Sequence, residues 1–265
     1  MRRTLGFLLL FLAVVAPMGL HALGSLSDLQ YKIKPADGNR LEAFFPATAR
    51  VLRGGEAPGC ITFTFDDGPD HRTTPVLLDQ LDRYGVKGTF FVNGARFHGR
   101  TAGGEENQAV LRDIYRRGHF IGSHTFSHQD ITALDDAGWK SEVSAMGTQI
   151  QGITGRPVRL FRPPFGRVSS ETLSRLSAEG LTVVMWNLDS LDWQATTVRQ
   201  LVSRAQQLID ENPEGGIFLL HDTNRNTAEA FPLIMEYLAS RNEMRKAQGK
   251  SILRVVGIDQ FLLKK

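Results

Sequence analysis

From Gly59 onward, short apolar segments alternate with longer amphipathic segments, and this alternation constrains the fold more than any other feature of the sequence. Short apolar runs bounded by turn residues are typical of buried strands. Strands that alternate with helices predict βαβ units and a parallel sheet. We expect strands at Cys60–Phe65, Gly88–Val92, Phe120–Gly122, Leu160–Phe161, Leu181–Met185, Gly216–Leu220 and Ile252–Val256.

Helical segments lie between these strands. The third shows the pattern most plainly, because its apolar residues recur at spacings of four and three, which is one face of an α-helix. No Gly-rich dinucleotide fingerprint accompanies the strands. The sequence therefore favours an α/β fold, a distorted (β/α) barrel of about seven strands, over an open sheet. The expected helices are Thr74–Tyr84, Asn107–Arg117, Gly138–Ile153, Ser169–Glu179, Thr197–Ile209 and Thr227–Ser240.

Residues 1–22 have the pattern of a secretory signal peptide. Arg2-Arg3 precede an uncharged apolar run, Leu5–Val15, and Ala22 precedes the expected cleavage point. The run is shorter than the ~20 residues that a spanning helix needs. We therefore expect a secreted or periplasmic bacterial protein with no stable membrane insertion after cleavage. Residues 23–57 show no sustained periodicity and are expected to form an N-terminal arm or linker before a domain at residues 58–265.

The charge balance argues against a nucleic-acid partner. The chain has 31 Lys and Arg against 28 Asp and Glu, and two of the basic residues are Arg2 and Arg3 of the predicted signal peptide. The mature protein would be nearly neutral, so it has no electrostatic footprint for nucleic acid. A neutral glycan is a better candidate substrate.

Polar residues gather where successive strands end. Asp66-Asp67 follow the first expected strand, His124–His128 the third, Arg162–Gly166 the fourth, Asp189–Trp193 the fifth and His221 the sixth. In a (β/α) barrel the C-terminal ends of the strands carry the active site. We expect these segments to meet at that end.

A carboxylate pair and two histidines indicate a catalytic metal site. Adjacent carboxylates at Asp66 and Asp67 repel one another unless a cation or a guanidinium compensates. His124 and His128, four residues apart, can face one point. Two imidazoles and one carboxylate leave a fourth position open, as in catalytic zinc sites, and the second carboxylate, Asp66, is free to act as a base. The alternatives are an acidic turn and a chance pair of histidines.

Two further segments supply candidates for positioning and proton transfer. Two prolines stiffen the loop after Arg162, which suits an Arg that holds a carboxylate, and leave the Phe165 N–H free to point into a site. The alternative is a Pro-rich turn with a surface Arg. His221, with a carboxylate such as Asp192 on a neighbouring loop, has the arrangement of a general acid. Trp193 offers an apolar wall for a sugar ring or an acetyl methyl.

Together these segments resemble the five ordered motifs of NodB-type polysaccharide deacetylases, carbohydrate esterase family 4, over roughly residues 58–262. The motifs are Thr64-Phe65-Asp66-Asp67-Gly68, His124-Thr125-Phe126-Ser127-His128, Arg162-Pro163-Pro164-Phe165-Gly166, Asp189-Ser190-Leu191-Asp192-Trp193 and Leu219-Leu220-His221. The third motif often carries Tyr where this chain has Phe165, which removes a hydroxyl but keeps the backbone N–H.

The resemblance implies a role for each position. Asp67, His124 and His128 would bind Zn²⁺, or another divalent ion such as Co²⁺, Ni²⁺ or Mn²⁺. Asp66 would be the base, tethered by Arg162, and His221, held by Asp192, would be the acid. The Phe165 N–H would help to hold the oxyanion. Leu219 and Trp193 would shape the pocket for the acetyl methyl.

The resemblance implies a metal-dependent hydrolase that removes N-acetyl groups from amino-sugar polymers, peptidoglycan or chitin-like oligosaccharides, and releases acetate. Two alternatives are an O-deacetylase of xylan and a catalytically silent carbohydrate-binding homologue. The second should lack Asp66 or His221, and both are present. The Gly-rich stretch Gly94–Asn107 is expected, from composition alone, to form a loop over the cleft.

Overall fold

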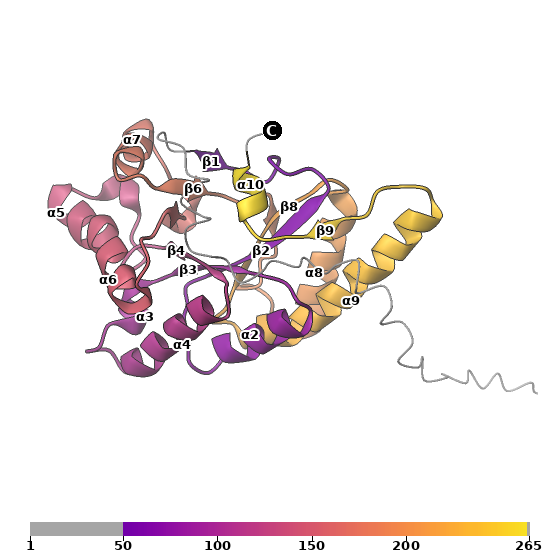
Figure 1. Cartoon of the computed structure of the whole chain (residues 1–265), viewed down its shortest axis with the longest axis horizontal. Helices are drawn as coiled ribbons and strands as arrows, with labels where there is room; N and C mark the ends of the chain where they lie inside the picture. Colours follow the sequence, from indigo (N-terminus) through magenta and orange to yellow (C-terminus); the bar gives the residue numbers. More distant parts are fainter. Residues whose placement is uncertain (1–49, 264–265) are drawn as a thin grey trace, which may run out of the picture.

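The computed structural model describes residues 50–263, which form a curled parallel sheet surrounded by helices (Figure 1). The sheet has nine strands. Eight follow the order β1-β6-β5-β4-β3-β2-β8-β7, and the ninth, β9, pairs with the start of β2. All of the expected strands are present, so the predicted α/β barrel type is confirmed. They are β2 (Cys60–Asp66), β3 (Thr89–Val92), β4 (Phe120–Ser123), β5 (Leu160–Phe161), β6 (Thr182–Val184), β8 (Gly215–His221) and β9 (Arg254–Val255).

Two strands were not predicted, β1 (Val51–Leu52) and β7 (Leu188–Asp189). Each has two residues, too few for a periodic pattern to appear. β1 pairs with β6 through Val51 and Val183, so the sheet begins inside the segment expected to be an arm. The predicted signal peptide, and the expected arm as far as residue 49, lie outside the described residues.

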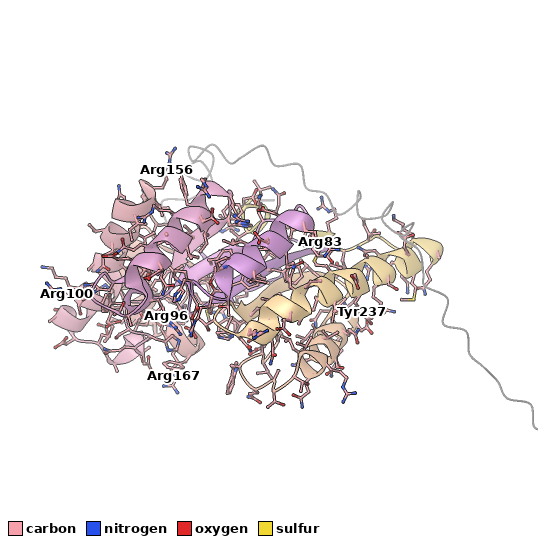
Figure 2. All side chains as sticks on the ribbon, turned by 90° about the horizontal axis from the view of Figure 1, so that it is seen from below. Arg83, Arg96, Arg100, Arg156, Arg167 and Tyr237 are labelled. Carbon is pink, nitrogen blue, oxygen red and sulfur yellow. The ribbon has the colours of Figure 1, made fainter. Side chains whose placement is uncertain are left out.

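The helices surround the sheet, and α2, α4 and α9 run beside one another on the face seen in Figure 2. The expected helices are α2 (Thr74–Arg83), α4 (Gly104–Arg116), α7 (Ser170–Ala178), α8 (Val198–Glu211) and α9 (Arg225–Ala247). The one expected at Gly138–Ile153 is instead α5 (Asp136–Trp139), a π turn (Lys140–Ser144) and α6 (Ala145–Thr154). Short additions are α3 (Gly94–Phe97), α10 (Asp259–Leu262) and 3₁₀ turns at Ile131–Ala133 and Pro164–Gly166.

The period of two along each strand separates an outer core from an interior. On β2, Ile61, Phe63 and Phe65 pack outward against the helices. Cys60 points to a second apolar cluster inside the curled sheet. That lower interior is filled by side chains of several strands and by α10, namely Phe120, Leu160, Ile217, Phe261 and Leu262. The polar side chains of the same strands occupy the upper interior, at the C-terminal strand ends.

Within residues 50–263, no helix has both the length and the apolar character needed to span a bilayer.

Candidate active site

Side chains that point inward from the C-terminal ends of the strands line one cleft, which has a volume of about 760 Å³. Asp66 on β2 and His221 on β8 are register partners, so their side chains point the same way. The N–H of His124 donates to the Val92 carbonyl oxygen at 2.9 Å, which prolongs the β3–β4 ladder to the cleft. The N–H of Arg162 likewise donates to Ser123 at 3.0 Å. Strand register therefore assembles residues far apart in sequence.

Three atoms that can act as metal ligands gather in this cleft. Asp67 Oδ1 lies 3.6 Å from Nε2 of both His124 and His128, and all three atoms lie within 4.8 Å of one another. Asp67 Oδ1 is buried and has no hydrogen-bond partner among residues 50–263. Such an atom requires an explanation, and an ion is one. Tetrahedral zinc with ligands at ~2.1 Å needs donors at about this separation, so the residues present fit a divalent ion.

His124 has the tautomer that a metal ligand needs. Its Nδ1 lies 2.7 Å from the Arg162 carbonyl oxygen, which can only accept, so Nδ1 carries the proton and the lone pair is on Nε2. Burial lowers the pKa of His124 to about 3, which keeps the ring neutral at physiological pH. An imidazole oriented by a carbonyl is the usual outer-shell arrangement of metal-binding histidines.

The loop that carries Asp67 is packed against a buried carboxyl group. Asp67 itself has a positive φ of 71°. A Cβ on the next residue, Gly68, would lie 2.0 Å from the Asp222 carboxylate, so only glycine fits there. Asp222 Oδ2 accepts a 2.5 Å hydrogen bond from the Thr74 hydroxyl, and burial raises the pKa of Asp222 to about 7. The sequence analysis gave Asp222 no role, although it directly follows His221.

Asp66 and Arg162 form a buried ion pair beside the donor cluster. Arg162 Nη1 donates to Asp66 Oδ1 at 2.8 Å, and Arg162 is fully buried. Burial raises the pKa of Asp66, while the Arg162 charge opposes that rise. The other oxygen, Asp66 Oδ2, lies 3.8 Å from His124 Nε2 and faces the cleft. A carboxylate with one oxygen held and one directed at the cleft can accept a proton.

Asp192 and His221 form a second pair across the cleft. His221 Nδ1 lies 2.6 Å from Asp192 Oδ1, and Asp192 Oδ2 accepts from the His221 N–H and from the Thr227 hydroxyl. Burial alone would lower the pKa of His221, but the hydrogen bond and charge of Asp192 outweigh it and raise this pKa to about 9. His221 is therefore protonated at neutral pH and able to donate a proton from Nε2.

Two exposed aromatic side chains line the cleft. Phe165 is 60% exposed and Trp193 is 65% exposed, whereas Leu219 is buried in the wall. Phe165 has a φ of 59°, and the turn hydrogen bonds of its loop are donated by Gly166 and Arg167. All ten residues that the sequence analysis named lie in or beside the cleft. Pro163 and Asp189, which the sequence analysis quoted within two motifs without giving them a role, also line the cleft. The sequence analysis missed five further lining residues, for which nearness to the motifs is the only sequence signal: Trp186, Ala195, Thr223, Asn224 and Arg225.

The expected loop over the cleft is wrong. Residues 94–107 form α3, a short connection at residues 98–103 and the start of α4, and none of them lines the cleft. The N–H groups of Gly94 and Ala95 donate to the carbonyl oxygens of Thr125 and Phe126, so α3 supports the histidine segment from behind. Composition indicated a loop because four glycines and several charges fall close together, but most of the segment is helical and it lies away from the cleft.

Comparison with known proteins identifies the family. The family model described as polysaccharide deacetylase matches residues 53–184. A chitooligosaccharide deacetylase from Azorhizobium caulinodans is 35% identical over 165 residues, which cover 61% of this chain and 73% of the relative. The chain belongs to the polysaccharide deacetylase family.

Other similar proteins agree with this family. A peptidoglycan-N-acetylglucosamine deacetylase from Bacillus cereus is 26% identical over 62% of this chain, but the match spans only 56% of that relative's length. A family 4 carbohydrate esterase from Streptomyces lividans, solved in complex with acetate, superposes with a TM-score of 0.59 at 33% identity, over 69% of this chain and 89% of the esterase.

Proposed function

We propose that this polysaccharide deacetylase family member is a metal-dependent hydrolase that removes N-acetyl groups from amino-sugar polymers and releases acetate. The substrates would be peptidoglycan or chitin-like oligosaccharides. One observation carries the proposal: the donor atoms of Asp67, His124 and His128 share a cleft with Asp66 and His221. The names of the relatives, which act on peptidoglycan and chitooligosaccharides, support this substrate class.

Asp67, His124 and His128 would hold the ion, with Zn²⁺ the first candidate from a set of two imidazoles and one carboxylate. When bound, the ion would polarise the acetyl carbonyl and make a water molecule more acidic. The remaining chemistry is proton transfer, which the chain's own side chains would perform.

Asp66 would take a proton from the attacking water through the oxygen that Arg162 does not hold. As the carbonyl oxygen gains negative charge, the Phe165 N–H would donate a hydrogen bond to it. The C–N bond then breaks, and His221 Nε2 would give its proton to the departing amine nitrogen. Asp192 stabilises the protonated imidazole before this transfer.

Substrate positioning would come from the cleft walls. Leu219 would contact the acetyl methyl, and the exposed face of Trp193 would support the sugar. A signal peptide at residues 1–22 would bring the domain at residues 58–265 to the periplasm or the exterior of the cell.

Acetate release from peptidoglycan, chitin oligomers and acetylated xylan, with and without chelator and added Zn²⁺, tests the proposal. We expect chelator-sensitive release from an N-acetylated glycan, restored by Zn²⁺. Release from xylan alone would replace the N-deacetylase by an O-deacetylase. Acetate release that is unchanged by chelator would contradict the metal requirement. No acetate release from any of the three substrates would favour a carbohydrate-binding protein without activity.

A further inference from the structure

The histidine segment has a backbone conformation that its own residues do not favour. Thr125 and His128 have φ values of 66° and 63°, in the left-handed region. That region is unfavourable for residues other than glycine, and most unfavourable for a β-branched residue such as Thr. The segment joins two proposed metal ligands, His124 and His128, so its conformation determines whether both imidazoles face one point. Contacts from outside the segment must stabilise it.

One residue outside the segment, Glu142, accepts three hydrogen bonds from it. Glu142 accepts hydrogen bonds from the Ser127 N–H at 2.7 Å and from the Ser127 hydroxyl at 2.6 Å through its two carboxylate oxygens. Its backbone carbonyl oxygen accepts from the Phe126 N–H at 3.0 Å. Glu142 is 5% exposed, so these bonds are shielded from water. A buried carboxylate is costly unless hydrogen-bonded, and here Ser127 and the adjacent Gln129, whose Nε2 donates to Glu142 Oε1 at 3.3 Å, provide the donors.

The local helix geometry explains how Glu142 contacts the histidine segment with both its carboxylate and its backbone carbonyl. Glu142 lies in the π turn Lys140–Ser144, between α5 and α6 (Figure 1). Hydrogen bonds of a π turn span five residues, as the Ala145 N–H to the Lys140 carbonyl does here, and so displace the turn from α-helical register. π turns of this kind occur frequently at functional sites.

We infer that Glu142 is a positioning residue that holds the histidine segment in its metal-binding conformation, and that it thereby sets the affinity for the divalent ion. The inference rests on the proposed function only in requiring that Asp67, His124 and His128 bind an ion. Glu142 contacts neither the ligand atoms nor the cleft lining, so its effect would be transmitted through Ser127 and Phe126.

The Kd for Zn²⁺, measured on the metal-free protein by competition with a chromophoric chelator, tests the inference. We expect Glu142→Ala to raise this Kd about 10- to 100-fold, the usual effect of losing an outer-shell partner. Glu142→Gln keeps an acceptor for the Ser127 N–H and a donor for its hydroxyl, so we expect it to stay within about 3-fold of wild type. The Zn²⁺-induced rise in melting temperature should shrink in Glu142→Ala, because that rise depends on Kd.

Glu179→Ala is the matched control. Glu179 accepts from the Trp139 indole at 2.6 Å and from the Ser144 hydroxyl at 2.8 Å, so it fastens the same helical segment without contacting the histidine segment. Its removal should lower the melting temperature of the metal-free protein but leave the Kd within about 2-fold. A Kd raised equally by Glu179→Ala would show that general destabilisation, not positioning, is the cause.

The possible failures are distinguishable. If the wild-type protein binds no divalent ion, the proposed function fails. If the wild type binds Zn²⁺ and folded Glu142→Ala binds it equally well, the inference about Glu142 is overturned while the proposed function stands. If Glu142→Ala does not fold, Glu142→Asp is the deciding variant, because it keeps the negative charge but moves the carboxylate away from Ser127 by one methylene. An unchanged Kd for Zn²⁺ in Glu142→Asp would overturn the inference.

Discussion

The two halves of the cleft differ in how complete they are. In the half proposed for proton transfer, here called the proton-transfer half, Asp66 is held by Arg162 at 2.8 Å and Asp192 lies 2.6 Å from His221. In the half proposed to bind a metal, here called the metal-binding half, Asp67 Oδ1 lies 3.6 Å from Nε2 of each histidine and has no hydrogen-bond partner in the described chain. Protein groups pair with one another in the first half, whereas a cation would supply the missing partner in the second.

Positive φ occurs in both halves. Asp67, Thr125 and His128 belong to the metal-binding half or to the segment that joins its proposed ligands, whereas Leu191, next to Asp192, belongs to the proton-transfer half. Left-handed residues of this kind each cost about 1–3 kcal/mol and persist only where their surroundings determine them. The metal-binding half has three such residues and, on our proposal, would depend on outer contacts such as those of Glu142, whereas the proton-transfer half has one beside its two direct ion pairs.

His124→Ala should have the largest effect, because it removes a proposed ligand and so destroys the metal-binding half. We expect Zn²⁺ affinity and acetate release to fall together by more than about 100-fold, since even outer-shell changes cost up to that much. Elemental analysis and an acetate assay would measure both. A folded variant that retains full activity in the presence of chelator would contradict the metal mechanism.

Asp66→Asn should impair only the proton-transfer half. Without the base, turnover should fall about 10²- to 10⁴-fold, while Zn²⁺ content stays close to that of wild type. Metal content and kcat on the same preparation make the comparison. Deacetylation at the wild-type rate would mean that another group accepts the proton.

Asp192→Asn should move the alkaline limb of the pH profile. On the proposed mechanism His221 acts in its protonated form, and Asp192 raises its pKa to about 9. Without that charge the pKa should fall toward the ordinary value of about 6.5, so the imidazole loses its proton at a lower pH. At pH 8 this leaves about 30-fold less of the protonated form. A profile of kcat/KM against pH would test this, and an unshifted alkaline limb would exclude His221 as the acid.

Trp193→Ala should have the smallest effect, because the exposed ring belongs to neither half. We expect KM to rise about 2- to 10-fold, the range for losing an aromatic contact, with kcat, Zn²⁺ content and the pH profile nearly unchanged. A large fall in kcat would place the ring nearer to the reacting atoms than its 65% exposure indicates.

The sequence predicted the parts of the molecule that have local patterns. Strands such as β2 and β8 were predicted because each contains a run of apolar residues, and the polar residues after them mark the active-site end. The π turn was not predicted, because the apolar spacing of its helix looks the same with or without it. Glu142 was missed for a related reason: one Glu in a helical stretch gives no sign that folding will bury it against Ser127. Positive φ at Thr125 is likewise invisible, since it arises from tertiary contacts.

Arg162 has a consequence for how this protein can vary. Its guanidinium donates to Thr64 and Asp66 on β2 and to the carbonyl oxygens of Val184 and Met185 at the end of β6, while its own backbone continues β5. Many enzymes gain stability when a functional residue is replaced, because function and stability make opposing demands. Here the side chain that holds the proposed base, Asp66, also cross-links three strands. Replacing it would lose both properties at once, so selection for robustness and selection for activity act in the same direction at this position.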